Sequence, residues 1–122
     1  MSKMQQFEFH HYTTPPPGTS PRTWEPLEPG ITQMTLNSDP STGRVMCLQR
    51  WEPNTRNEIQ NFVHDYIEEI FIVEGDLRDL KGREGGTVWR KGAYAYRKPG
   101  MDHGPFGSEG GCLMFITCTP VG

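Results

Sequence analysis

The sequence lacks the features that mark secreted, membrane-spanning or nucleic-acid-binding proteins. Its three cysteines are an odd number, widely spaced and without a C-x-x-C pair, which argues against a disulfide framework or a zinc knuckle. No run approaches the ~18 apolar residues of a membrane-spanning helix, and the N-terminus has no apolar signal core. A formal net charge of −3 provides no broad basic field. We therefore expect a cytoplasmic protein with neither nucleic acid nor a membrane as its partner.

Long segments with a helical apolar period are also missing. The chain contains 14 glycines and 11 prolines, which interrupt it often. Between them lie short runs of β-branched and aromatic residues, bounded by Gly, Pro, Asn and Asp. A length of 122 residues suits one domain. The sequence thus predicts a single all-β domain.

The alternation of apolar and polar residues predicts where the strands lie. We expect strands over residues 31–36, 44–51, 67–73, 77–80, 87–89, 93–96 and 112–119. Gly75-Asp76 is expected to turn the chain between two of them, and residues 24–30 to form a loop pinned by Trp24. Residues 1–23 are expected to form an N-terminal arm, with a short strand over its Phe7/Phe9 alternation as the alternative, ahead of one barrel over residues 24–122.

The residues best suited to catalysis or metal binding are two histidines and one glutamate. His64 and Glu68 lie four positions apart, and a second isolated histidine, His103, follows the Pro99-Gly100 turn. Imidazole nitrogens and carboxylate oxygens suit Fe(II), Zn, Mn or Ni, and two histidines with one carboxylate leave coordination positions open. A histidine and a glutamate at this spacing are common by chance. Taken alone, either histidine is better interpreted as an ordinary core residue with a hydrogen-bond partner.

The wider spacing adds to this evidence. Glu68 is followed by six residues and then Gly75, while Gly92 is followed by a strand, the Pro99-Gly100 turn, two residues and His103. These two patterns resemble the paired motifs of the cupin superfamily. Within it, residues 24–119 resemble ChrR-type cupins and their relatives, which include acetylacetone-cleaving dioxygenases; the likeness rests on residues 24–30, 42–44, 68–75, 103–106 and 109–112. The resemblance implies a double-stranded β-helix, the cupin jelly-roll barrel, with a metal between its sheets.

The resemblance also implies a set of site residues. His64, Glu68 and His103 would be the metal ligands, with Fe(II) the first choice and Zn, Mn or Ni as alternatives. The chain departs from the pattern at Phe62, where the family places the first histidine of a His-x-His pair. Three alternatives follow: a site with three ligands, a pocket that has lost its metal, or a metal-free enzyme in which the same three residues act as general acid and base.

Other side chains are assigned to the pocket, the core or the surface. Phe62, Tyr96 and Phe106 are expected to line the pocket. Arg97 is expected at the surface, like Arg50 and Arg56, rather than against an anionic substrate. Cys112 and Cys118 are expected to be buried thiols. The remaining aromatic and large apolar residues are expected mainly in the core, and they are Trp51, Trp89, Tyr94, Phe115 and Met114.

Together these features favour a small-molecule enzyme of the cupin type. The expected reaction is metal-dependent oxygenation with C–C cleavage of a dicarbonyl- or polyketide-like substrate. A metal-free isomerase, lyase or cyclase that uses histidine and glutamate acid–base catalysis is the alternative. A ligand- or metal-sensing binding module is an alternative of another class. The cupin resemblance further implies a homodimer, in which we expect the N-terminal arm to participate.

Overall fold

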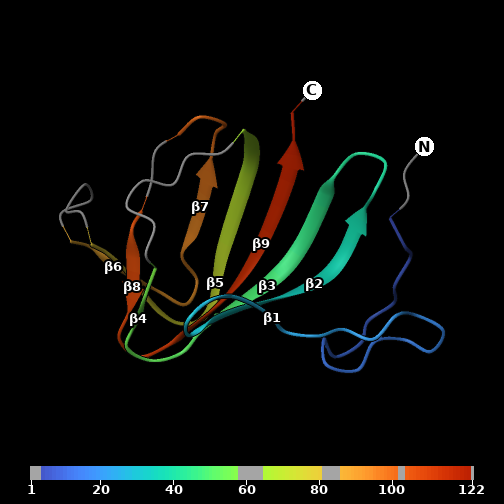
Figure 1. Ribbon diagram of the computed structural model, residues 1–122, viewed down its shortest axis with the longest axis horizontal. Coiled ribbons are helices and arrows are strands. Elements are labelled where there is room, and N and C mark those ends of the chain that lie inside the picture. Colours follow the sequence, from blue (N-terminus) through green and yellow to red (C-terminus); the bar gives the residue numbers. More distant parts are fainter. Residues whose placement is uncertain (1–3, 58–64, 81–85, 102–103, 122) are drawn as a thin grey trace.

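The computed structural model describes residues 4–57, 65–80, 86–101 and 104–121. Within these ranges the chain forms nine β-strands and no helix (Figure 1). Accordingly, no helix in the described part of the chain could cross a membrane. The strands are β1 (Glu25–Glu28), β2 (Ile31–Asp39), β3 (Arg44–Trp51), β4 (Thr55–Arg56), β5 (Tyr66–Asp79), β6 (Val88–Arg90), β7 (Tyr94–Arg97), β8 (Phe106–Ser108) and β9 (Cys112–Pro120).

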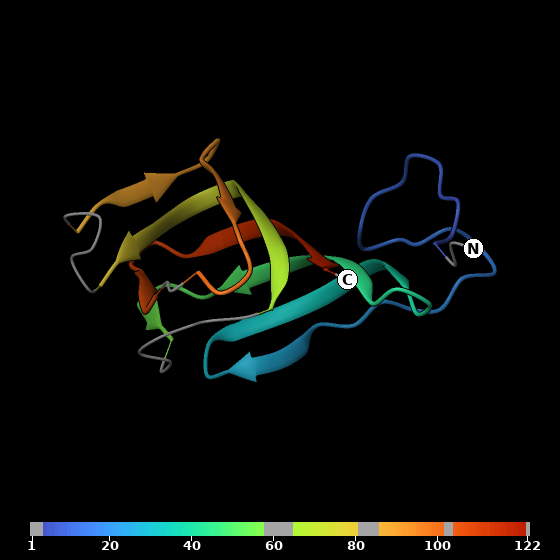
Figure 2. The ribbon, with the colours of Figure 1, turned by 90° about the horizontal axis from the view of Figure 1, so that it is seen from above.

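The strands form one curled sheet around β5. Its order is β1-β2-β3-β9-β5-β8-β4, with β6 and β7 also paired to β5. Every pairing recorded between these strands is antiparallel. Seen from above, the sheet curls into a barrel, with β5 and β7 on one side and β1 and β2 on the other (Figure 2). The predicted all-β architecture is confirmed.

The strand β5 runs unbroken through the point where the sequence predicted a turn. Gly75 adopts a φ of +85° inside the strand, and a Cβ added there would lie 2.0 Å from the carbonyl oxygen of Gly111. The pairing with β9 shifts register between Ile72 and Glu74, which marks a bulge. The prediction of a turn was therefore wrong: this glycine permits a bulge and a close backbone approach. Beyond it, β5 changes partners from β7 to β6 and β8.

Other strand predictions were more accurate. The bounds of β3 are those predicted, and β2 continues three residues past the predicted end at Leu36 to Asp39. The segment predicted as a loop after Trp24 forms β1, which pairs with β2. That pairing is irregular between Pro26 and Glu28, as expected where a proline interrupts an edge strand.

The core lies on the concave face of the sheet, where inward-facing residues of several strands meet. Trp51, Phe106 and Met114 are buried there as predicted. Tyr94 is 60% exposed, so its assignment to the core was wrong. The core cluster comprises Ile31, Cys47, Trp51, Ile70, Ile72, Leu77, Phe106, Cys112, Met114 and Ile116.

The segment before β1 forms no strand over residues 4–24 and lies beside the far end of β2 (Figure 1). Hydrogen bonds attach it to that strand: the Asn37 amide donates to the Gln5 carbonyl at 2.9 Å, and the Arg22 guanidinium donates to the Leu36 carbonyl at 3.2 Å. Trp24 packs at the other end of the segment, where the Arg50 guanidinium carbon lies 4.2 Å from its ring centroid. The alternation at Phe7 and Phe9 thus produces an irregular segment that is attached to the barrel by a few polar contacts.

Candidate functional site

A cavity of about 380 Å³ lies inside the curled sheet and is called the inner cavity below. One half of its wall is apolar and comes from the core. The other half carries amide, hydroxyl, thiol and charged groups from several strands. Its lining residues are Leu27, Glu28, Ile31, Gln33, Gln49, Trp51, Asn57, Tyr66, Glu68, Ile70, Leu77, Arg97, Phe106, Met114, Ile116 and Cys118.

The charged centre of this wall is an ion pair between β5 and β7. Glu68 faces inward because it alternates along β5 with residues of the outer face, and it is a direct cross-strand partner of Arg97. The Arg97 Nη1 atom lies 3.5 Å from Glu68 Oε1, and the two side chains are only 12% and 11% exposed. The Arg97 guanidinium carbon also lies 4.9 Å from the Phe106 ring centroid. A cation therefore stands between the carboxylate and an aromatic face.

The inward position of Arg97 differs from the surface position predicted from the sequence. The two-residue period of β7 places Arg97 on the same face as Ala95 and as Ala93 just before the strand, and both alanines pack against the core. The same period turns Tyr94 and Tyr96 outward. Arginine is usually exposed, so the sequence-based prediction followed residue type, whereas the position along the strand determined the outcome.

Opposite the ion pair, a chain of side-chain hydrogen bonds fixes three polar groups. The indole Nε1–H of Trp51 donates to Gln49 Oε1 at 2.8 Å. The Gln49 amide nitrogen donates in turn to Gln33 Oε1 at 3.1 Å. Each residue then has a defined orientation, and the second amide hydrogen of Gln49 and the amide group of Gln33 remain on the cavity wall. Such groups can recognise carbonyl and hydroxyl oxygens.

A second polar hydrogen-bonded contact holds Phe106 in place. The Phe106 backbone N–H donates to Asn57 Oδ1 at 2.8 Å, and the Asn57 backbone N–H donates to the Phe106 carbonyl at 3.0 Å. This reciprocal pair connects the segment after β4 to the start of β8. The backbone of Phe106, whose ring contacts the Arg97 guanidinium, is therefore held in place.

Weakly acidic groups lie near Glu68: Tyr66 and Cys118 line the inner cavity, and Cys47 is buried in the core. Burial, the neighbouring Cys118 and the charge of Glu68 raise the pKa of Cys47 to about 12 and that of Tyr66 to about 12. Burial and Glu68 raise the pKa of Cys118 to about 11. These groups are therefore neutral at physiological pH, and neither thiol has the thiolate character of a nucleophile. Of the two carboxylates on the described wall of this cavity, Glu28 is half-buried and Glu68 is buried, so Glu68 is the candidate acid or base.

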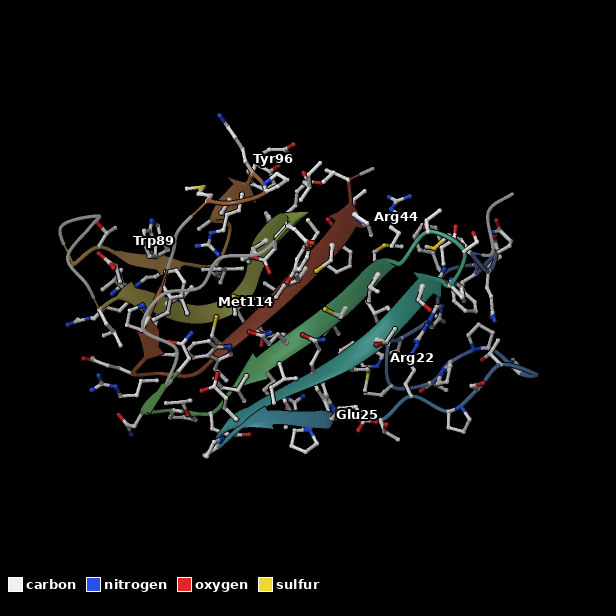
Figure 3. All side chains as sticks on the ribbon, turned by 45° about the horizontal axis from the view of Figure 1, so that its top comes forward. Arg22, Glu25, Arg44, Trp89, Tyr96 and Met114 are labelled. Carbon is white, nitrogen blue, oxygen red and sulfur yellow. The ribbon has the colours of Figure 1, made fainter. Side chains whose placement is uncertain are left out.

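A second cavity of about 290 Å³, called the outer cavity below, adjoins the first. Four residues line both cavities, namely Ile70, Leu77, Arg97 and Phe106. The other lining residues come mainly from the side of the sheet that carries β6 and β7. Figure 3 shows Trp89 and Tyr96 on this side, away from Glu25 of β1. They are Ile72, Asp79, Trp89, Ala93, Tyr94, Ala95, Tyr96, Met101 and Gly104.

The residues predicted for the site are only partly described. Glu68 lines the inner cavity, Phe106 lines both cavities and Tyr96 lines the outer one. His64, His103 and Phe62 lie outside the described residues, so their roles stay predictions.

Sequence reasoning did not single out Gln33, Gln49, Asn57 and Tyr66 as lining residues. Gln49 and Tyr66 do share their strand phase with Cys47 and Glu68, which is a signal that could have identified them.

The metal predicted from the sequence can be tested only against part of its ligand set. No group of three or more His, Cys, Asp and Glu side chains able to hold a metal ion occurs within residues 4–57, 65–80, 86–101 and 104–121. Glu68 fits the oxygen ligand of a divalent cation, since its carboxylate faces a cavity. The same carboxylate, beside a guanidinium, also fits acid–base chemistry.

Comparison with known proteins shows which family matches this chain and which solved structures resemble it. The family model of the ChrR cupin-like domain matches residues 18–122. An RmlC-like cupin from Shewanella frigidimarina NCIMB 400 is similar, with 16% identity, 96% of this chain and 92% of that chain covered, and a TM-score of 0.70. Acetylacetone dioxygenase from Acinetobacter johnsonii shares 18% identity over 94% of this chain and 77% of that chain, with a TM-score of 0.66. The polyketide cyclase RemF from Streptomyces resistomycificus shares 18% identity over 74% and 65%, with a TM-score of 0.59.

No curated protein matches the sequence. At these identities the structural likeness establishes the fold alone, and it confirms the predicted cupin barrel. The family model is more specific because it extends over the whole barrel, from before β1 to the end of β9. The chain therefore belongs to the family of ChrR cupin-like domains.

Proposed function

We propose that the chain is a small-molecule enzyme whose active site is the inner cavity around Glu68. The observation that carries this proposal is the Glu68–Arg97 ion pair in the cavity wall. Removing both charges from water is costly, and such a pair adds less to stability than well-packed apolar residues of similar size. Buried charges that line a cavity are candidates for catalysis or ligand binding.

The proposed substrate is an oxygenated small molecule of the dicarbonyl or polyketide type. The names of two structural neighbours, an acetylacetone dioxygenase and a polyketide cyclase, support this class. The wall chemistry agrees with it: the Arg97 guanidinium can donate to an enolate oxygen, and the amides of Gln33 and Gln49 can donate to a carbonyl. The apolar half of the wall would hold the carbon skeleton.

The first candidate reaction is metal-dependent oxygenation with C–C cleavage. A divalent metal, Fe(II) in the first place, would supply Lewis-acid polarisation of the carbonyl and access to O₂ chemistry. His64, Glu68 and His103 are the residues that would hold it. Arg97 would orient the substrate through its oxygen, and the apolar side chains around Ile70 would exclude bulk water.

The second candidate is metal-free acid–base catalysis, and the Glu68–Arg97 contact favours it specifically. The Glu68 carboxylate would take a proton from the carbon between two carbonyl groups. Arg97 would stabilise the enolate through its N–H donors. Return of the proton to another atom isomerises the substrate, whereas loss of a leaving group or attack on a second carbonyl gives elimination or cyclisation.

Metal content and turnover measured together distinguish these reactions. Protein purified without chelator is analysed for transition metals and assayed with acetylacetone and 1-phenyl-1,3-butanedione, following O₂ uptake and product formation. Oxygenation predicts near-stoichiometric metal and O₂ uptake, both lost in His64→Ala and His103→Ala. Neither compound has a leaving group, so acid–base chemistry predicts faster exchange of the protons between the two carbonyl groups with solvent deuterium. This exchange would need neither metal nor O₂ and would be lost in Glu68→Gln. Absence of both binding and turnover across dicarbonyl and polyketide-like compounds would refute the proposed function.

A further inference from the structure

We propose that the outer cavity is a second subsite, which takes a neutral aromatic or alkyl tail of the substrate whose oxygenated head occupies the inner cavity. This inference rests on the proposed function for the identity of the head group. It narrows the substrate class from compact dicarbonyls to longer molecules with an apolar end. The outer cavity itself is a feature of the fold and is independent of the reaction.

The two cavities are adjacent parts of one site. Arg97 and Phe106 line both and lie against each other, with 4.9 Å between the guanidinium carbon and the ring centroid. Beyond Phe106, the Trp89 ring meets it edge-to-face at 6.3 Å. A charged group, an aromatic ring and an indole thus follow one another from Glu68 outward. This order matches a molecule that is polar at one end and apolar at the other.

The outer cavity exists because two small side chains, Ala95 in β7 and Ala93 just before it, face the interior. Ala95 is the cross-strand partner of Ile70, and the Ala93 carbonyl accepts a hydrogen bond from the Ile72 backbone N–H at 2.9 Å. Larger side chains at these two inward positions would fill the space between β5, Trp89 and Phe106. Protein interiors are close-packed and contain few voids larger than a water molecule, so a space of this size is unusual.

The charge distribution specifies the tail further. Asp79 is buried and lines the outer cavity. Arg97 is the cation among the described residues of this lining, and its guanidinium is already paired with Glu68. An anionic tail would therefore gain little from Arg97 and would lie near the Asp79 carboxyl group. The remaining groups, which include Trp89 and Met101, provide apolar and polarisable contacts. A neutral aromatic or alkyl tail therefore fits this lining.

The volumes also agree with a two-part ligand. Binding sites for small molecules usually measure about 300–1,000 Å³. The outer cavity at about 290 Å³ and the inner one at about 380 Å³ each lie near the lower end of that range. A molecule that occupies both would use a site of ordinary size.

The test compares ligands that differ only in the tail. Affinities of acetylacetone and 1-phenyl-1,3-butanedione are measured by calorimetry for the wild type and for Ala95→Leu, which fills the outer cavity from β7. We expect the phenyl compound to bind at least tenfold more tightly to the wild type. Ala95→Leu should abolish this preference and leave the affinity for acetylacetone within about twofold. An unchanged preference in Ala95→Leu would overturn the proposal.

Two further variants keep the test interpretable. Val73→Leu is a matched control, because Val73 lies on β5, is partly exposed and lines neither cavity; it should preserve the preference. Trp89→Ala enlarges the outer cavity and should shift the preference toward 1-naphthyl-1,3-butanedione. This opposite change remains informative if Ala95→Leu does not fold, and an unaltered ranking in Trp89→Ala would count against the subsite.

A failure of the proposed function can be separated from a failure of the subsite. If no diketone binds, the same measurements are made with 4-phenyl-2-butanone, which keeps the tail and lacks the dicarbonyl head. Binding that Ala95→Leu blocks would support the subsite while the dicarbonyl substrate is rejected. Binding that is insensitive to both Ala95→Leu and Trp89→Ala, or no binding of any phenyl compound, would refute the subsite.

Discussion

Arg97 Nη1 and Glu68 Oε1 lie 3.5 Å apart across the β5–β7 ladder, and both side chains are almost fully removed from solvent. A pair in this position has two consequences. It couples the strand that carries the cupin-like glutamate to the strand that forms the outer cavity. It also places one positive and one negative charge where only both together can be accommodated.

Removing one member of this pair should strongly destabilise the protein. Arg97→Met leaves the Glu68 carboxylate buried without this cation, and losses of about 3–5 kcal/mol are typical when one partner of a buried pair is removed. The double variant Glu68→Gln/Arg97→Met should recover part of that loss. Urea unfolding of the wild type, both single variants and the double variant gives the coupling free energy directly.

The chain supplies a matched surface pair as the control. Arg78 Nη2 lies 3.7 Å from Glu109 Oε1, with side chains 45% and 74% exposed. Exposed pairs contribute only about 0.2–1 kcal/mol, so Arg78→Met should change the free energy of unfolding by no more than that. Equal losses in Arg78→Met and Arg97→Met would contradict the argument from burial.

The hydrogen-bonded side chains of Trp51, Gln49 and Gln33 predict two losses of stability of different size. Gln49→Leu removes the acceptor of the Trp51 indole N–H, and an unsatisfied buried donor costs about 1–3 kcal/mol. Gln33→Leu removes only the acceptor of the Gln49 amide, which is half-buried and can reach water in the cavity. We therefore expect a larger loss for Gln49→Leu than for Gln33→Leu in urea unfolding monitored by tryptophan fluorescence. The reverse order would show that the indole is satisfied in another way.

The parts of the fold that the sequence predicted are those governed by local pattern. The bounds of β3 could be predicted because its apolar run, residues 45–48, lies between clear turn signals at Gly43 and Pro53. The continuity of β5 could not. Gly75 serves equally well in a turn or at a close approach, and its reason for being glycine is the Gly111 carbonyl, which is distant in sequence.

The site shows the same division between local and long-range information. Glu68 could be expected in the cavity wall because the motif around it is contiguous in sequence. Arg97 was missed as an interior residue, although its position along β7 matches that of Ala93 and Ala95. That position turns it inward, and the residue it meets there across the ladder is Glu68. Strand pairing between segments so far apart cannot be read from residue types alone.

The three cysteines should be unreactive in the folded protein. The pKa values of Cys47 and Cys112 are raised to about 12 and that of Cys118 to about 11, mainly through burial. Because the thiolate is the reactive form, modification by Ellman's reagent at pH 8 should be slow in the native state and rapid in guanidinium chloride. Thr35→Cys, which adds an exposed thiol on β2, should react at once under native conditions. Rapid reaction of native wild-type thiols would contradict the raised pKa values.

The same shifts make stability depend on pH in the alkaline range. The folded-state pKa of each thiol lies above its ordinary value of 9.0, so the unfolded chain loses protons first as the pH rises. The stabilisation is therefore complete below about pH 9 and is lost between about pH 9 and pH 12. Thermal unfolding should give a constant Tm between pH 7 and pH 8.5 and a falling one above pH 9. Replacing Cys47 with Ala should make that fall shallower.

The close approach at Gly75 predicts a difference between two glycines with similar backbone angles. Gly75 has a φ of +85° and Gly92 a φ of +93°, so alanine at either position meets the left-handed strain of about 1–2 kcal/mol. At Gly75 the new Cβ would also lie 2.0 Å from a backbone oxygen of Gly111, whereas at Gly92 nothing lies within 4 Å. Gly92→Ala should therefore fold with a modest loss of stability. Gly75→Ala should lose clearly more than this strain, because β5 and the turn before β9 would have to separate. Urea unfolding of both variants measures the difference, and similar losses would show that β5 and Gly111 do not approach so closely.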